Sequence, residues 1–133
     1  MSNSTVLCNG CFDPLHIGHL WHFQAARKMG ETLVVAVTKN GFVKKGKGRP
    51  MFHHDERAAM IRALAIVDEV IIVESSIEAL STVKPQHWCI GSEYRHKLIP
   101  EDASYCRAHG IHIHYTEEKT YSSTRICALL RED

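Results

Sequence analysis

Two histidines three residues apart carry the clearest chemical signal in the sequence. His16 and His19 close the run Asn9-Gly-Cys-Phe-Asp-Pro-Leu-His-Ile-Gly-His19, and Gly18 between them lets a ligand approach the backbone. Residues at this spacing share one side of a helical turn. Backbone amides and the positive end of the helix dipole would make this turn an anion site. Either histidine alone could be an ordinary helix-start residue, but together they could stabilise charge on a phosphoryl group in transfer.

Two further segments could contact phosphates. From Lys39 to Arg49 the chain has five cations, three glycines and no acid, which indicates a mobile basic loop. Near the C-terminus, Ser122, Ser123 and Thr124 offer hydroxyls and amides at a helix start. Without a role in phosphate binding, the first segment would be a solvent-exposed loop and the second an ordinary helix N-cap.

Two cysteines allow a different chemistry. Cys8 and Cys11 form a C-x-x-C pair, which could be a redox dithiol. With His16 and His19 they form C-x2-C-x4-H-x2-H, close to the spacing of a zinc knuckle, and the chain would then be a binding module. Both alternatives are disfavoured, because Cys8 belongs to a strand that should be buried and the two side chains would point apart on the pleat. Five cysteines in a chain with ample apolar residues predict reduced thiols.

The segments that must position these residues alternate between strand and helix. Asp55 is expected to cap the second helix and Gly30 to end the first in a left-handed conformation. The order predicts a Rossmann-like α/β fold, with a doubly wound parallel five-stranded sheet and a ligand site at the carboxyl ends of its strands. The hydrophobic patterns predict strands over 5–9, 32–38, 69–73, 87–90 and 111–115, and helices over 15–29, 55–65, 76–83, 100–109 and 122–130.

Length and charge exclude several classes of protein. A chain of 133 residues, 44% of them hydrophobic, has room for one domain over 1–133 but not for two. Sixteen Lys and Arg against fifteen Asp and Glu give no field suited to coating a nucleic acid duplex. No apolar run approaches the roughly 20 residues that span a bilayer, and the N-terminal five residues do not resemble a signal peptide. We therefore expect a cytoplasmic protein with neither nucleic acid nor membrane as partner.

The sequence resembles the cytidylyltransferase-like nucleotidyltransferases in four blocks that follow in the same order. Gly10 to His19 is similar to the H-x-G-H signature of this family. Arg49 to Val70 resembles the segment after the second strand in glycerol-phosphate cytidylyltransferases and heptose-phosphate adenylyltransferases. Gly91-Ser-Glu-Tyr94 resembles the turn after the fourth strand, and Ser122 to Thr124 the turn before the last helix. The resemblance covers roughly Val6 to Leu130.

The resemblance implies a reaction. A substrate phosphate attacks the α-phosphorus of a nucleoside triphosphate and releases pyrophosphate, without a covalent enzyme intermediate. It favours CMP transfer from CTP to a polyol or sugar phosphate, and ATP with a sugar phosphate is the alternative. Mg²⁺ is expected to bind through substrate phosphates rather than a cage of carboxylates, with Asp13 the one acid placed to help. A homodimer is also expected.

The resemblance further implies roles for individual residues, although neither subgroup is matched throughout. Cytidylyltransferases often have an arginine before the last turn, where Lys119 is the only cation here, and adenylyltransferases often have a lysine at the position of Ile90. Glu93 would accept hydrogen bonds from ribose hydroxyls. The catalytic set would be His16, His19, Lys44 and Arg57. The nucleotide-binding set would be Asn9, Gly10, Cys11, Phe12, Gly18, Lys47, Gly91, Glu93, Ser122, Ser123, Thr124 and Arg125.

Overall fold

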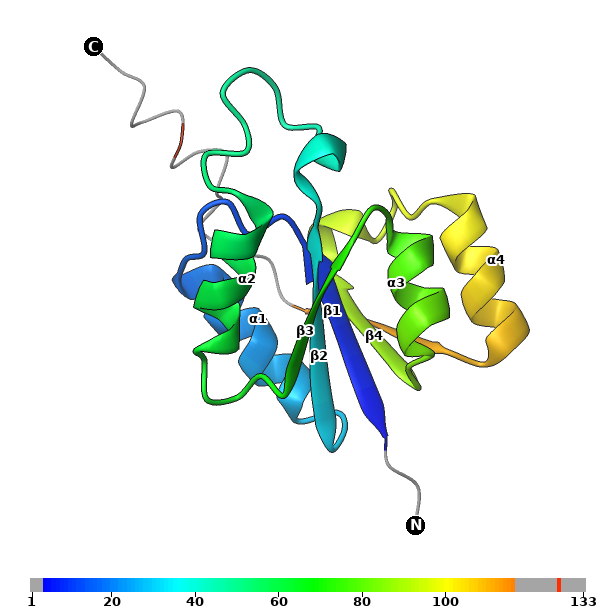
Figure 1. The fold of residues 1–133 in the computed structure, drawn as a ribbon. Helices are drawn as coiled ribbons and strands as arrows, with labels where there is room; N and C mark the ends of the chain where they lie inside the picture. Colours follow the sequence, from blue (N-terminus) through cyan, green and yellow to red (C-terminus); the bar gives the residue numbers. More distant parts are fainter. Residues whose placement is uncertain (1–3, 117–126, 128–133) are drawn as a thin grey trace.

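Within the part of the chain that the structure describes, five parallel strands form one sheet between two layers of helices (Figure 1). The structure, a computed structural model, describes residues 4–116 and Cys127. The strand order is β3-β2-β1-β4-β5, as Figure 1 shows in part. This confirms the predicted parallel, Rossmann-like sheet. The strands are β1 (Thr5–Gly10), β2 (Thr32–Thr38), β3 (Glu69–Val73), β4 (His87–Gly91) and β5 (His112–Thr116).

Helices cover both faces of the sheet. One face carries α1 (Ile17–Arg27) and α2 (His54–Arg62), and the other carries α3 (Ser76–Val83) and α4 (Pro100–His109) (Figure 1). No helix among the residues described is long and apolar enough to cross a membrane. Of the helix predicted over 122–130, Cys127 is described and is helical, while 122–126 and 128–130 lie outside the described residues.

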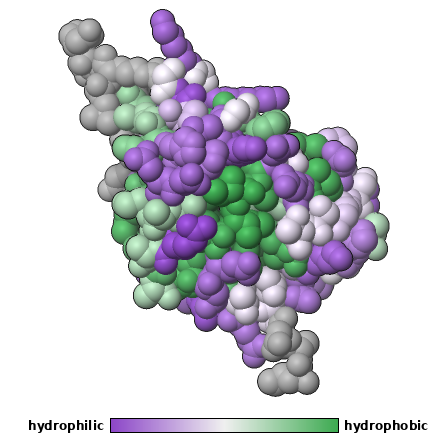
Figure 2. Space-filling view, viewed as in Figure 1, coloured by the Kyte–Doolittle hydropathy of each residue, from purple (hydrophilic) through white to green (hydrophobic). Residues whose placement is uncertain are grey.

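The two faces of the sheet are packed by different residues of the same strands. Val6 and Cys8 of β1 lie in one buried cluster with Phe23 of α1, whereas Leu7 lies in a second cluster with Trp88 of β4. This alternation follows from the pleat, and burial on both sides explains the continuous apolar runs of β1 and β2. Figure 2 shows an apolar area, framed by hydrophilic residues, at the centre of the face where Figure 1 places the edge strand β3.

The end of α1 differs from the prediction. Its C-cap is Lys28 in a right-handed conformation, and Gly30 is not among the glycines with positive φ. A Cβ at Gly30 would instead lie 2.8 Å from Cγ2 of Val6 and 3.0 Å from the carbonyl oxygen of Ser4. Glycine is required there because the chain passes close to the start of β1, not because it must turn left-handed.

The start of α2 also differs from the prediction. The N-cap is His53, whose Nδ1 accepts a hydrogen bond from the Asp55 backbone N at 3.1 Å. The Glu56 carboxylate accepts in return from the His53 backbone N at 3.1 Å, which completes a capping box. Asp55 is therefore not the cap. It lies in the first turn, where its charge is favourable next to the helix dipole.

Candidate active site

The turn between β1 and α1 folds back over the end of β1. Phe12 has a φ of 54°, and its ring lies so close to Gly10 that a Cβ there would be 3.1 Å from Phe12 Cζ. The same ring meets His19 edge to face, with ring centroids 4.9 Å apart at 78°. Gly10 therefore makes room for Phe12, and Phe12 supports one of the two histidines.

His16 and His19 are stacked at the start of α1. Their ring centroids lie 3.8 Å apart with an interplanar angle of 25°, so the structure brings them together as their spacing predicts. The helix begins at Ile17 rather than Leu15, because His16 is extended, with φ −145° and ψ 176°, and serves as its N-cap. His19 is buried, with an exposed fraction of 7%.

Backbone hydrogen bonds fix how both imidazoles are protonated. Nδ1 of His16 accepts from the Gly18 backbone N at 3.1 Å, and Nδ1 of His19 accepts from the His16 backbone N at 3.1 Å. A nitrogen that accepts carries no proton, so the proton of each neutral ring lies on Nε2. Each ring is thereby prepared as an Nε2–H donor.

A buried ion pair anchors the segment that follows the basic loop. Nε of Arg49 donates to Oδ2 of Asp13 at 2.8 Å, and the exposed fractions of the two side chains are 2% and 0%. The backbone N atoms of Met51 and Phe52 donate to the same carboxylate at 2.7 and 3.0 Å. Burial alone would raise the pKa of Asp13, but these hydrogen bonds outweigh it and hold the pKa below its usual value.

These contacts correct the expectation that Asp13 helps to hold Mg²⁺. Both oxygens of its carboxylate already accept hydrogen bonds from residues 49–52. Nη2 of Arg49 also donates to the Asp13 backbone carbonyl at 2.7 Å. Asp13 is therefore a structural anchor. Sequence reasoning missed the pair because its two members are 36 residues apart, one in the histidine segment and the other in the basic loop.

Arg57 is a second buried residue that connects the histidine turn to the chain around the basic loop. Its exposed fraction is 3%. Its guanidinium donates to the carbonyl oxygens of Cys11 at 2.8 Å and Phe52 at 2.9 Å, and to Oδ1 of Asn40 at 2.7 Å. Burial lowers the pKa of Arg57, and the nearby Asp13 carboxylate opposes this. The arginine assigned to catalysis thus makes the contacts of a positioning residue.

The remaining predicted residues are placed as follows. The Asn9 side chain donates to Oγ of Ser76 at 3.0 Å and accepts from Nε1 of Trp88 at 2.9 Å, which ties β1 to α3 and β4. Gly91 ends β4, and Glu93 lies in the short 3-10 helix η2 (Ser92–Tyr94). The predicted phosphate contacts Ser122, Ser123, Thr124 and Arg125 lie outside the described residues.

The basic loop rises from the same end of the sheet as the histidine turn. It follows β2 and begins with the 3-10 helix η1 (Asn40–Phe42), and Figure 1 shows it above the carboxyl ends of the strands. Lys44 and Lys47 are both exposed. The structure thus places these cations, the stacked histidines and the Gly91 turn at the edge where parallel α/β sheets bind ligands.

The structure gives no support to the zinc knuckle, and the full burial of Cys8 disfavours a redox dithiol. Within residues 4–116 and Cys127, the clusters whose ligand atoms could share a metal ion are Cys8, His22 and Cys89, and the exposed set His53, His54 and Asp55. Cys8 is fully buried and is grouped with residues other than Cys11, His16 and His19. The spacing pattern in the sequence therefore does not correspond to a site in space.

Comparison with known proteins links this geometry to one family. A family model described as cytidylyltransferase-like matches residues 7–128. The chain is 38% identical over 102 residues to the bifunctional protein HldE of Streptomyces coelicolor, and 39% identical over 98 residues to that of Campylobacter fetus. The matches cover 74% and 71% of this chain but 22% and 21% of the relatives. The chain thus spans about a fifth of the length of these relatives.

Solved structures show the same fold. The lipopolysaccharide core biosynthesis protein of Thermoplasma volcanium has a TM-score of 0.71 and 27% sequence identity, over 90% of this chain and 98% of that one. A pantoate-β-alanine ligase from Francisella tularensis has a TM-score of 0.69 over 98% of this chain and 72% of that one. Its sequence identity is 12%, so this second likeness concerns the fold alone.

Proposed function

The chain belongs to the cytidylyltransferase-like family of nucleotidyltransferases, and from that premise we propose that it transfers AMP from ATP to the phosphate of a sugar phosphate. The stacked pair of His16 and His19 is the observation that carries the proposal. Two neutral imidazoles with Nε2–H groups at a helix N-terminus suit an α-phosphate whose charge increases during transfer. Both donors are fixed by the backbone before the substrate arrives.

The proposed reaction needs little from the protein beyond positioning and charge. An oxygen of the acceptor phosphate attacks the α-phosphorus, the bond from the α-phosphorus to its bridging oxygen breaks, and pyrophosphate leaves with that oxygen. A phosphate is already a competent nucleophile, so no general base is required. Mg²⁺ would enter with the triphosphate, since it binds chiefly through substrate phosphates and waters. The homodimer expected from the resemblance stays a prediction.

The relatives support a sugar phosphate over a polyol phosphate as acceptor. The matched relatives are HldE proteins and a lipopolysaccharide core biosynthesis protein, and the core of a lipopolysaccharide is built from sugars. Of the two subgroups that the sequence resembles, the heptose-phosphate adenylyltransferases act on a sugar phosphate, and they use ATP. The sequence motifs resemble both subgroups and on their own favour CTP. The preference is therefore reversed, and the adenylyltransferase alternative becomes the proposal.

A screen of pyrophosphate release tests this choice. ATP, CTP, UTP and GTP are each crossed with sugar phosphates and polyol phosphates, in the presence of Mg²⁺. We expect release with ATP only when a sugar phosphate is present. Turnover of CTP with ATP inert would restore the cytidylyltransferase interpretation, and no acceptor-dependent release with any pair would count against both.

Lys44 is expected to act on turnover more than on binding. A cation on an exposed loop that closes over the nucleotide acts mainly in the transition state, so Lys44→Ala should lower kcat by more than it weakens ATP affinity. Lys47→Ala provides the matched control on the same loop and should have the milder effect. Steady-state kinetics and nucleotide titration measure the two quantities. If Lys44→Ala keeps the wild-type kcat and the wild-type ATP affinity, Lys44 takes no part in transfer and the loop is an ordinary solvent-exposed segment.

A further inference from the structure

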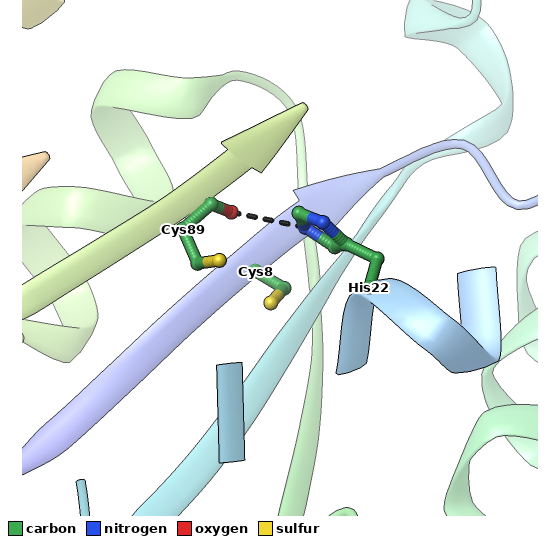
Figure 3. A group of neighbouring side chains, drawn as sticks. All are labelled: Cys8, His22 and Cys89. Carbon is green, nitrogen blue, oxygen red and sulfur yellow. Dashed lines mark hydrogen bonds between the residues drawn. The ribbon is translucent and has the colours of Figure 1, made fainter. Parts of the chain in front are cut away.

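Three metal-binding side chains meet under α1 in a place that the proposed reaction does not use. Cys8 of β1 follows Leu7, which pairs with Trp88, so Cys89 lies beside Cys8 on the neighbouring strand β4. His22 of α1 lies against the same face, as Figure 3 shows. The two sulfur atoms and an imidazole nitrogen all lie within 4.8 Å of one another.

We propose that Cys8, His22 and Cys89 form a binding site for Zn²⁺. Ligand atoms around a tetrahedral zinc ion lie about 3.5 to 3.8 Å apart, given bonds of about 2.0 to 2.3 Å. Small side-chain rotations would therefore close the site. Three protein ligands leave one position of the tetrahedron for a water molecule, as in other zinc sites with two cysteines and one histidine.

The charge and the ligand atoms of the Cys8, His22 and Cys89 site favour one class of metal ion. Cys8 and Cys89 are fully buried, where an uncompensated charge is costly. Two thiolates and a neutral imidazole balance a divalent ion, whereas a monovalent soft ion such as Cu⁺ would leave a buried negative charge. Mg²⁺ and Ca²⁺ prefer oxygen ligands. A divalent ion that accepts sulfur and nitrogen ligands is thus the class that fits, and Zn²⁺ is its usual representative in proteins.

The hydrogen bonds of His22 assign the nitrogen that would bind the ion. Nε2 lies 3.1 Å from the Cys89 carbonyl oxygen, and Nδ1 lies 2.8 Å from Oγ1 of Thr116. A carbonyl can only accept, so Nε2 carries the proton and Nδ1 accepts from the Thr116 hydroxyl. A hydroxyl can also accept. The ring proton can therefore move to Nδ1 and keep the Thr116 contact, which frees Nε2 for the metal with an outer partner that orients the ring.

The thiols already interact. Burial raises the pKa of Cys8, while the hydrogen bond from Cys8 lowers the pKa of Cys89. Binding would displace one proton from each thiol, so two protons leave for each Zn²⁺ bound. The ion would connect β1 and β4 to the helix that begins with His16 and His19. Its expected effect is on stability, and the proposal does not depend on the identity of the nucleotide.

Metal analysis of the purified protein tests the site. Wild-type protein, prepared under reducing conditions without chelator, should hold about one zinc ion per chain. Its Co²⁺ form should show a thiolate-to-cobalt charge-transfer band, a readout independent of activity and of any variant. Cys89→Ser and His22→Gln should lose the zinc. Cys106→Ser removes another buried cysteine, on the opposite face of the sheet, and should keep it.

Cys11→Ser separates this site from the knuckle spacing, because Cys8 is common to both sets. We expect Cys11→Ser to retain zinc. Loss of zinc in Cys11→Ser together with retention in Cys89→Ser would overturn the proposal. So would folded, reduced wild-type protein that takes up neither Zn²⁺ nor Co²⁺ through thiolates. Circular dichroism of each variant shows whether a loss of metal accompanies a folded chain.

Discussion

Replacing either His16 or His19 by alanine is expected to lower turnover by about 10²- to 10³-fold, the size found when one prearranged donor to a developing oxyanion is lost. Each ring offers one Nε2–H, because its Nδ1 accepts a backbone hydrogen bond. The measurement is kcat with saturating nucleotide and acceptor. The fold should survive, since His16 lies at the helix start and losing an N-cap costs about 1 kcal/mol.

His53→Ala is the matched control for this experiment. His53 caps α2 with the same arrangement with which His16 caps α1. The variant should therefore show the stability cost of a lost cap without the loss of turnover. Thermal unfolding of all three variants separates the two effects. Wild-type kcat in both His16→Ala and His19→Ala would show that the stacked pair takes no part in transfer.

Asp13→Ala is expected to destabilise the protein by about 3 to 5 kcal/mol, as breaking one side of a buried ion pair does. The change leaves the Arg49 guanidinium buried without its counter-charge and removes the acceptor for the backbone N atoms of Met51 and Phe52. Urea unfolding measures the free energy. Glu74→Ala is the control, because Glu74 pairs with Lys39 at the surface and an exposed pair is worth about 0 to 1 kcal/mol.

Acid should remove the contribution of Asp13. Its pKa is lower in the folded chain than its usual value, so its stabilisation is complete above the usual value and is lost as the pH falls through the folded value. The difference in unfolding free energy between wild type and Asp13→Asn should therefore shrink below about pH 4. A difference that stays constant or grows on acidification would show that the carboxylate is not stabilised by its partners.

Element bounds can be predicted from the sequence wherever a local pattern of residues determines them. β2 and β3 have the predicted bounds, because continuous apolar runs end at polar residues or turns. α3 and α4 also have theirs, because a serine cap, an N-terminal proline and a C-terminal glycine mark their ends. The contact between the stacked histidines could also be predicted, since a spacing of three residues at a helix start determines it.

Contacts between distant segments could not be predicted. Arg57 has the sequence environment of an exposed helical cation. Only the fold shows that its guanidinium donates to the carbonyl oxygen of Cys11. The sequence likewise offers only Cys11 as a partner for Cys8, through the C-x-x-C spacing, and disfavours that pairing without indicating another. The strand order sets β1 beside β4 instead, which makes Cys89 the neighbour of Cys8. Neither contact has a local signal in the sequence, because each joins segments that lie far apart along the chain.

The fate of the nucleotide phosphates distinguishes transfer of AMP from transfer of the terminal phosphate. The protein is incubated with a mixture of sugar phosphates and with ATP labelled at the α- or the γ-phosphate. We expect α-label to enter a new, acceptor-dependent product, while γ-label appears only in pyrophosphate. Transfer of γ-label to the sugar phosphate, or release of labelled AMP without a joined product, would contradict the proposed transfer of AMP.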